Sequence, residues 1–124
     1  MHSPFAPTET RRVLIVDDDP AVLDGLKAGF EMEGKTVVTS AAFQDARRRL
    51  LEEDFDLLAT DVRLGAFNGL QLAVIARDRN PEMKIIVFSG FDDAVLQAEA
   101  ARLRAHYLVK PVSLERLFEV IASL

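Results

Sequence analysis

The sequence predicts a doubly wound α/β domain, which is an open parallel β-sheet with helices on both faces. Short apolar runs suited to strands alternate five times with helix-like segments, and the connections between them are short. Three of the runs, at residues 13–16, 57–60 and 85–88, are apolar almost throughout, as strands covered on both faces are. Because helical crossovers between parallel strands are right-handed, this alternation builds a single sheet. We find no internal repeat and no second domain.

The strands are predicted from apolar or β-branched runs that end at turn and capping residues. Residues 1–10 contain two prolines and no periodicity, so we expect a flexible tail there, followed by one domain over residues 11–124. The second run is the most polar and is expected at a sheet edge. In chain order the predicted strands are residues 12–16, 36–39, 56–60, 84–88 and 107–109.

The first two helices are predicted from caps and apolar spacing. Asp19 is an N-cap residue, and Pro20 stands at the first helical position, where a missing N–H has no cost. Apolar residues recur every four positions until Gly34, which ends this helix as a left-handed cap. Ser40 is expected to cap the second helix, on which the arginines at 47–49 are expected to face solvent.

The last three helices are predicted in the same way. Asn68 is expected to cap a helix over about residues 69–79. Asp92 is expected to cap an alanine-rich helix over about 93–103, whose apolar stripe is weak. Ser113 is expected to cap the last helix, which has a strong apolar stripe.

Composition limits the classes of function. The chain has 124 residues and no cysteine, which excludes a disulfide framework and a thiolate zinc site. No apolar stretch is long enough to span a membrane, and the N-terminus does not resemble a signal peptide, so we expect a cytoplasmic protein without a membrane partner. The net charge of −5 argues against direct binding of nucleic acid by this domain.

Residue types that bind phosphate and divalent cations follow four of the five strands. Asp17 and Asp18 follow the first strand, and Asp61 follows the third. Ser89 ends the fourth, and Lys110 follows the fifth. The carboxyl ends of parallel strands lie at one edge of the sheet, so we expect these side chains to meet in one shallow site.

The acidic residues of this edge predict a magnesium site. Like charges brought together raise one another's pKa, and a bound cation compensates for the repulsion. Mg²⁺ prefers oxygen ligands and commonly uses one or two carboxylates. An aspartate after a strand is often only a helix cap, as we expect for Asp19, but Asp17, Asp18 and Asp61 together favour metal binding.

Asp61 is the candidate nucleophile, because it stands alone after the central strand at the start of a glycine-bearing loop. A carboxylate can accept a phosphoryl group and form an aspartyl phosphate. The charge of that group must be neutralised on several sides. Lys110 is expected to supply one cation and Ser89 a hydroxyl, while Pro111 favours an extended Lys110 and allows a cis bond.

Taken together, these motifs resemble the receiver domain of response regulators in two-component signal transduction, over about residues 11–124. Each motif is common by itself, but the complete set, in this order and at strand ends, is highly specific. The matching residues are Asp17, Asp18, Asp61, Gly69, Ser89, Tyr107, Lys110 and Pro111.

The resemblance implies a flavodoxin-like (βα)5 fold with a five-stranded parallel sheet of order 2-1-3-4-5. It implies that Asp18 and Asp61 bind Mg²⁺ directly, that Asp17 acts through water, and that the backbone carbonyl of Arg63 completes the protein ligands. A sensor histidine kinase or a histidine phosphotransfer protein would supply the phosphoryl group from a phosphohistidine. The domain would catalyse only its own phosphorylation and dephosphorylation.

The resemblance also implies how the signal is passed on. Ser89 and Tyr107 would act as switch residues. The surface that changes would comprise the helix over 93–103, the strand over 107–109 and the last helix. That surface would bind a partner or a second copy of the chain.

Three residues depart from the usual receiver pattern. Gly65 follows Leu64 in a loop that commonly carries a proline, which predicts a more mobile loop. Arg63 places a long cation beside the site, and Phe91 is apolar where many receivers are polar. In the family the positions of Arg63 and Phe91 flank the path of hydrolytic water, so these two residues bear on the lifetime of the phosphoryl group.

Two other functions compete with this interpretation. A phosphohydrolase of the haloacid dehalogenase type also has an Asp-x-Asp motif after a strand, here Asp17 to Asp19, and a later serine and lysine. Such enzymes need a further acidic pair after the lysine, whereas the acids beyond Lys110 are Glu115 and Glu119 on a helix. The third interpretation is a receiver-like interaction module that never takes up phosphate.

Overall fold

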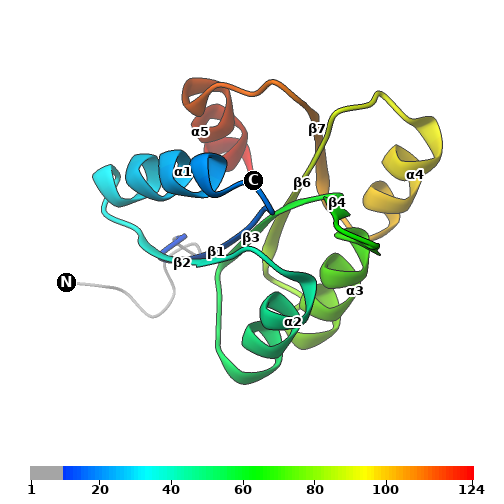
Figure 1. The fold of residues 1–124 in the computed structure, drawn as a ribbon, viewed down its shortest axis with the longest axis horizontal. Coiled ribbons are helices and arrows are strands. Elements are labelled where there is room, and N and C mark those ends of the chain that lie inside the picture. Colours follow the sequence, from blue (N-terminus) through cyan, green and yellow to red (C-terminus); the bar gives the residue numbers. More distant parts are fainter. Residues whose placement is uncertain (1–9) are drawn as a thin grey trace.

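A computed structural model describes residues 10–124, in which a five-stranded sheet lies between two layers of helices (Figure 1). The tail predicted at residues 1–10 lies outside the described residues, apart from Thr10. Within the described chain, no helix is both long and apolar enough to cross a membrane.

The main sheet has five parallel strands in the order β2-β1-β3-β6-β7. With the strands numbered by their place among these five, the order is 2-1-3-4-5, which confirms the prediction. The polar second strand lies at an edge, also as predicted. The strand bounds are β1 Arg12–Val16, β2 Thr36–Ser40, β3 Leu57–Asp61, β6 Lys84–Ser89 and β7 His106–Val109.

Helices cover both faces of this sheet. In Figure 1, α1 and α5 lie on one side of the strands, and α2, α3 and α4 lie on the other. The doubly wound α/β class is therefore confirmed. The helix bounds are α1 Pro20–Met32, α2 Phe43–Glu52, α3 Leu70–Arg79, α4 Ala94–Arg102 and α5 Leu114–Ser123.

The strands contribute to two hydrophobic cores because successive side chains point to opposite faces. In β1, Val13 and Ile15 pack in the core shared with α1 and α5. Leu14 and Val16 pack in the core shared with α2 and α3. All four are buried, so both faces of the central strands are apolar, which fixes the register of the strand ends that carry the polar residues.

Two of the predicted helix caps are correct. The Asp19 carboxylate accepts a hydrogen bond from the Ala21 N–H at 2.9 Å, and the Ser113 hydroxyl accepts one from Arg116 at 3.1 Å. Gly34, with φ of 79°, takes the left-handed conformation predicted at the end of α1.

Two other predicted caps are wrong. Ser40 is the last residue of β2, and its hydroxyl donates to the Ala42 carbonyl at 3.0 Å, so α2 begins only at Phe43. Asp93, not Asp92, caps α4 by accepting the N–H groups of Val95 and Leu96 at 2.8 and 3.1 Å. The two adjacent aspartates offer the same chemistry, so residue type alone could not choose between them.

The loop after β3 contains a small hairpin that the sequence analysis did not predict. It consists of β4, Arg63–Leu64, and β5, Phe67–Asn68, around Gly65 with φ of 63°. Asn68 accepts a hydrogen bond from the Leu70 N–H at 2.8 Å as α3 begins, although Gly69 occupies the N-cap position.

Candidate functional site

The ends of β1, β3 and β7 bring four of the predicted site residues together. Asp17 and Asp18 follow β1, Asp61 is the last residue of β3, and Lys110 follows β7. One carboxylate oxygen from each aspartate lies within 4.8 Å of those of the other two. Residues that are far apart in the sequence therefore form one compact acidic group at the carboxyl edge of the sheet.

Lys110 is the cation of this group. Its ammonium lies 3.2 Å from Oδ2 of Asp17 and 3.4 Å from Oδ2 of Asp61. The Lys110 N–H donates to the Ser89 carbonyl at 2.7 Å, which ties the lysine to the end of β6. The Lys110–Pro111 peptide bond is cis, the alternative that the sequence left open.

The three carboxylates differ in their surroundings. Asp17 is 3% exposed, and its Oδ1 accepts the N–H of Asp19 at 2.9 Å. Asp18 is exposed, and Asp61 is intermediate. Asp17 is thus fixed within the protein, while Asp18 and Asp61 remain open to an incoming group.

Burial and charge act in opposite directions on Asp61. Burial raises the pKa of its carboxyl, the Lys110 ammonium lowers it, and the nearby Asp17 and Asp18 raise it again, so the net shift is upward. Burial disfavours the charged form of Lys110, but Asp61 and Asp17 outweigh this, and the pKa of Lys110 is raised. The lysine therefore stays an ammonium, and around Asp61 it is the cation that opposes the effects of burial and of the two neighbouring carboxylates.

The backbone around Asp61 is held in place by Gly69. A Cβ atom at position 69 would lie only 2.0 Å from the Asp61 carbonyl oxygen and 2.9 Å from the Thr60 hydroxyl. The Gly69 N–H donates to the Val62 carbonyl at 2.6 Å, and the Val62 N–H donates to the Phe88 carbonyl at 2.8 Å. Only glycine allows this close approach of α3 to the end of β3.

Ser89 lies at the same edge but is engaged elsewhere. It is 4% exposed, and its hydroxyl accepts the N–H of Phe91 at 3.1 Å. The carbonyl of Phe91 accepts the hydroxyl of Tyr107 at 2.6 Å. The backbone of Phe91 therefore links the two predicted switch residues directly, a connection that the sequence analysis missed because it treated Phe91 only as an apolar side chain.

Arg63, two positions beyond Asp61, contacts Phe91, two positions beyond Ser89. Its guanidinium lies 5.0 Å from the centre of the Phe91 ring, within the range of a cation–π contact. The contact joins the start of β4 to the β6–α4 loop. Sequence spacing could not reveal it, because Arg63 and Phe91 follow different strands.

The residues present fit a hard divalent cation. Asp17, Asp18 and Asp61 offer carboxylate oxygens, the ligand type that Mg²⁺ prefers, and the exposure of Asp18 leaves room for water ligands. The cluster contains neither histidine nor cysteine, the ligands that favour Zn²⁺ and copper.

Comparisons with known proteins agree on one family. A family model for the response regulator receiver domain matches residues 13–122. The alginate biosynthesis transcriptional regulatory protein AlgB of Pseudomonas putida is 37% identical over 109 residues, which are 86% of this chain and 24% of that protein. This chain thus spans about a quarter of the length of that regulator.

Solved structures show the same similarity. The CheY-like response regulator receiver domain protein of Methanospirillum hungatei matches with a TM-score of 0.86 and 32% identity, over 93% of each chain. A response regulator of Burkholderia pseudomallei, solved with a phosphorylated aspartic acid, a calcium ion and citrate, matches with a TM-score of 0.81 and 26% identity. That match covers 91% of this chain and 72% of the other.

Proposed function

The chain belongs to the receiver domains of response regulators, and on that premise we propose that Asp61 accepts a phosphoryl group from a phosphohistidine. The donor would be a sensor histidine kinase or a histidine phosphotransfer protein. The observation that carries the proposal is the arrangement around Asp61, where a cation lies 3.4 Å from a carboxylate that has two further carboxylates beside it. The Burkholderia relative, which was solved with a phosphorylated aspartic acid, supports the same chemistry.

The proposed reaction uses the Asp61 carboxylate as nucleophile. One carboxylate oxygen forms a bond to phosphorus while the bond from phosphorus to the donor imidazole breaks. Lys110, an ammonium 3.4 Å from Asp61, would neutralise negative charge on an oxygen of the transferred group. The domain would thus catalyse its own phosphorylation, and hydrolysis of the acyl phosphate would return it to the starting state.

We propose that Asp18 and Asp61 bind Mg²⁺ directly, with the Arg63 carbonyl as a further ligand and Asp17 acting through water. When bound, Mg²⁺ supplies positive charge to the oxygens of the phosphoryl group. The ion pair of Asp17 with Lys110 supports the indirect role of Asp17, because one of its oxygens is already engaged by the lysine and the other by Asp19.

The signal would leave the site through Ser89, Phe91 and Tyr107. A phosphoryl group on Asp61 adds acceptor oxygens, and the Ser89 hydroxyl would move toward them as a hydrogen-bond donor. Such a movement would pull on Phe91, and through its carbonyl on Tyr107. Of the residues of α4 only Ala100 is buried, so this helix is the least firmly packed and the first expected to shift.

The proposed output surface comprises α4, β7 and α5. It would bind a partner protein or a second copy of the chain. We expect the switched conformation of this surface to be partly populated without phosphate and predominant with it. The match to the receiver family over 13–122 favours this function over a dehalogenase-type hydrolase. An interaction module that takes up no phosphate is the alternative that the experiment must address.

Incubation with a small phosphodonor and Mg²⁺ tests the proposal. We expect one phosphoryl group per chain, labile to hydroxylamine as an acyl phosphate is, and no labelling of Asp61→Asn by intact mass spectrometry. Asp18→Ala should remove the dependence on Mg²⁺, and Asp17→Ala should weaken it less. Equal labelling of Asp61→Asn would show that Asp61 is not the acceptor, and no labelling of the parent would favour the interaction module that takes up no phosphate.

A further inference from the structure

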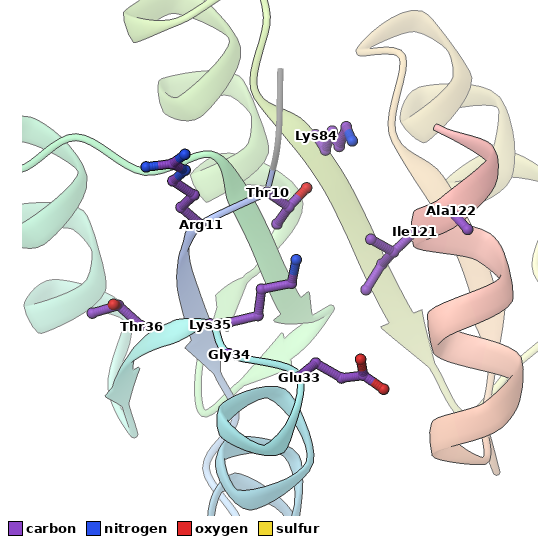
Figure 2. A pocket seen from close by; sticks show the side chains of 9 residues that line it. All are labelled: Thr10, Arg11, Glu33, Gly34, Lys35, Thr36, Lys84, Ile121 and Ala122. Carbon is purple, nitrogen blue, oxygen red and sulfur yellow. The ribbon is translucent and has the colours of Figure 1, made fainter. Parts of the chain in front are cut away.

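A separate cavity lies at the edge of the sheet opposite Asp61, where the strands begin (Figure 2). Its volume is about 700 Å³, and it lies between the start of β1, the α1–β2 turn, the first residue of β6 and the last turn of α5. The length of the sheet separates it from the acidic group, so it is a different site and rests on none of the roles proposed for Asp61.

The wall of this cavity contains a buried hydroxyl that has no hydrogen-bond partner among residues 10–124. Thr10 is 5% exposed, and its Oγ1 forms no hydrogen bond within the described part of the chain. A buried hydroxyl without a partner loses its interactions with water and gains nothing in return. In Figure 2 this oxygen is turned toward the side of the cavity where Lys84 and Ile121 lie.

Two half-buried lysines line the same cavity. Lys35 and Lys84 are both intermediate in exposure, and within residues 10–124 neither forms an ion pair with a carboxylate. Figure 2 shows the Lys35 side chain extending toward Thr10. Two positive charges that have lost part of their hydration, with no ion-pair partner among these residues, favour the binding of an anion in the cavity.

The neighbouring groups do not supply that anion. In Figure 2 the Glu33 carboxylate points toward α5 and away from Thr10, and the Arg11 guanidinium points away from Lys35. The carbonyls of Phe30 and Glu31 at the end of α1 already accept N–H groups of residues 33–35 at 3.0 to 3.1 Å. These two carbonyls are therefore already engaged and are not the partners of the Lys35 and Lys84 ammonium groups.

We propose that this cavity binds a small phosphate-class oxyanion, either inorganic phosphate or a phosphomonoester. The ammonium groups of Lys35 and Lys84 and the hydroxyl of Thr10 would be its donors, a set that matches an acceptor with several oxygens and two negative charges. A ligand that binds only the folded chain stabilises it, so this site would couple the stability of the receiver to an anion other than its own phosphoryl group.

Titration with sodium phosphate, followed by amide NMR, tests the location. Sodium chloride at equal ionic strength is the reference, Mg²⁺ is omitted, and glycerol 3-phosphate in a parallel titration distinguishes a monoester from free phosphate. We expect changes in amide chemical shift centred on Thr10, residues 34–36 and Lys84. Shifts confined to residues around Asp61 and Lys110, or equal shifts with chloride, would overturn the proposal.

Matched variants test the donors. Lys35→Gln should weaken phosphate binding about tenfold, the loss expected for one charge-assisted hydrogen bond. Lys27→Gln removes the same charge from an α1 side chain that pairs with Glu31, and it should change the affinity little. An equal loss of phosphate affinity in both variants would show that binding depends only on net charge, and would overturn the proposed site.

Thr10→Val gives a readout that a general charge effect cannot produce. Valine has the same shape without the unpaired hydroxyl, so without phosphate the variant should melt at the same or a higher temperature than the parent. Phosphate should then raise the melting temperature of Thr10→Val less than it raises that of the parent, because the two lysines remain but one donor is lost. Undiminished stabilisation of Thr10→Val by phosphate would exclude Thr10 as a donor and overturn the proposed site.

Discussion

Gly69→Ala should destabilise the protein although it adds only one methyl group. The new Cβ would lie 2.0 Å from the carbonyl oxygen of Asp61, and no flexible side chain stands there to move aside. The two groups must separate by more than about 1 Å to reach even a close contact. Because Asp61 pairs with Phe88 in the central sheet, the movement strains the β3–β6 ladder as well.

Inserting a methyl group into a closely packed position costs about 1–3 kcal/mol. Gly69 precedes the first residue of α3, so alanine regains little of the helix propensity that it would bring to a helix interior. We therefore expect a net loss of about 2 kcal/mol in the free energy of unfolding. Displacement of Asp61 should also slow phosphorylation by a small donor.

Gly25→Ala is the matched control. Gly25 lies inside α1, and a Cβ there would have no atom within 4 Å, so alanine should stabilise the protein by about 0.5–1 kcal/mol. Urea denaturation of both variants and the parent gives the three free energies. If Gly69→Ala unfolds at the same urea concentration as Gly25→Ala, the close approach of α3 to Asp61 is not a constraint.

Three further predictions concern charge and switching. Lys110→Ala should raise the pKa of Asp61 further, because the lysine is the cation that opposes burial there; NMR titration checks this, and an unchanged pKa would contradict it. A hydrogen bond from Arg48 lowers the pKa of Asp45 from 3.8 to about 2 against the effect of burial. Because the folded-state pKa lies below the unfolded value, the stabilisation is full above about pH 4 and disappears as the pH falls through 2. Asp45→Asn should therefore cost about 0.5 kcal/mol in urea denaturation at pH 7, since the pair is partly exposed, and a cost that does not shrink toward pH 2 would refute the assignment. Ser89→Ala should abolish the NMR shifts that beryllofluoride and Mg²⁺ induce over residues 89–110, and a normal response would exclude Ser89 as the link.

The parallel sheet and the acidic edge could be predicted because they depend on patterns that tertiary structure does not alter, whereas the strand order was implied by the resemblance to receiver domains. Val13 to Val16 are apolar without interruption, as a strand covered on both faces is, and all four are buried. Once the strands are parallel, their carboxyl ends share an edge, and Asp17, Asp61 and Lys110 must approach one another.

The details at element ends were less predictable. Asp92 and Asp93 have the same side chain, and only the local path of the chain decides which one caps α4. Ser40 has a capping side chain, but pairing with Val16 keeps it in β2. Which residue caps a helix depends on the energies of single hydrogen bonds, and these cannot be read from the pattern of residue types.

Contacts between loops were also beyond the sequence. The Arg63–Phe91 contact and the hydrogen bond from Tyr107 to the Phe91 carbonyl join segments that follow different strands. The second uses a backbone carbonyl, a group that every residue has. The one available signal was that Arg63 and Phe91 each stand two positions beyond a site residue, Asp61 and Ser89.

Chemical trapping of the phosphorylated residue tests the central proposal most directly. Borohydride reduces an aspartyl phosphate to homoserine, so the acceptor becomes a residue that tandem mass spectrometry of peptides can locate. After reaction with a phosphohistidine donor and Mg²⁺, we expect homoserine at position 61 and at none of the other aspartates. Homoserine at position 17 or 18, or none anywhere in a chain that has been shown to take up phosphate, would contradict the proposed role of Asp61.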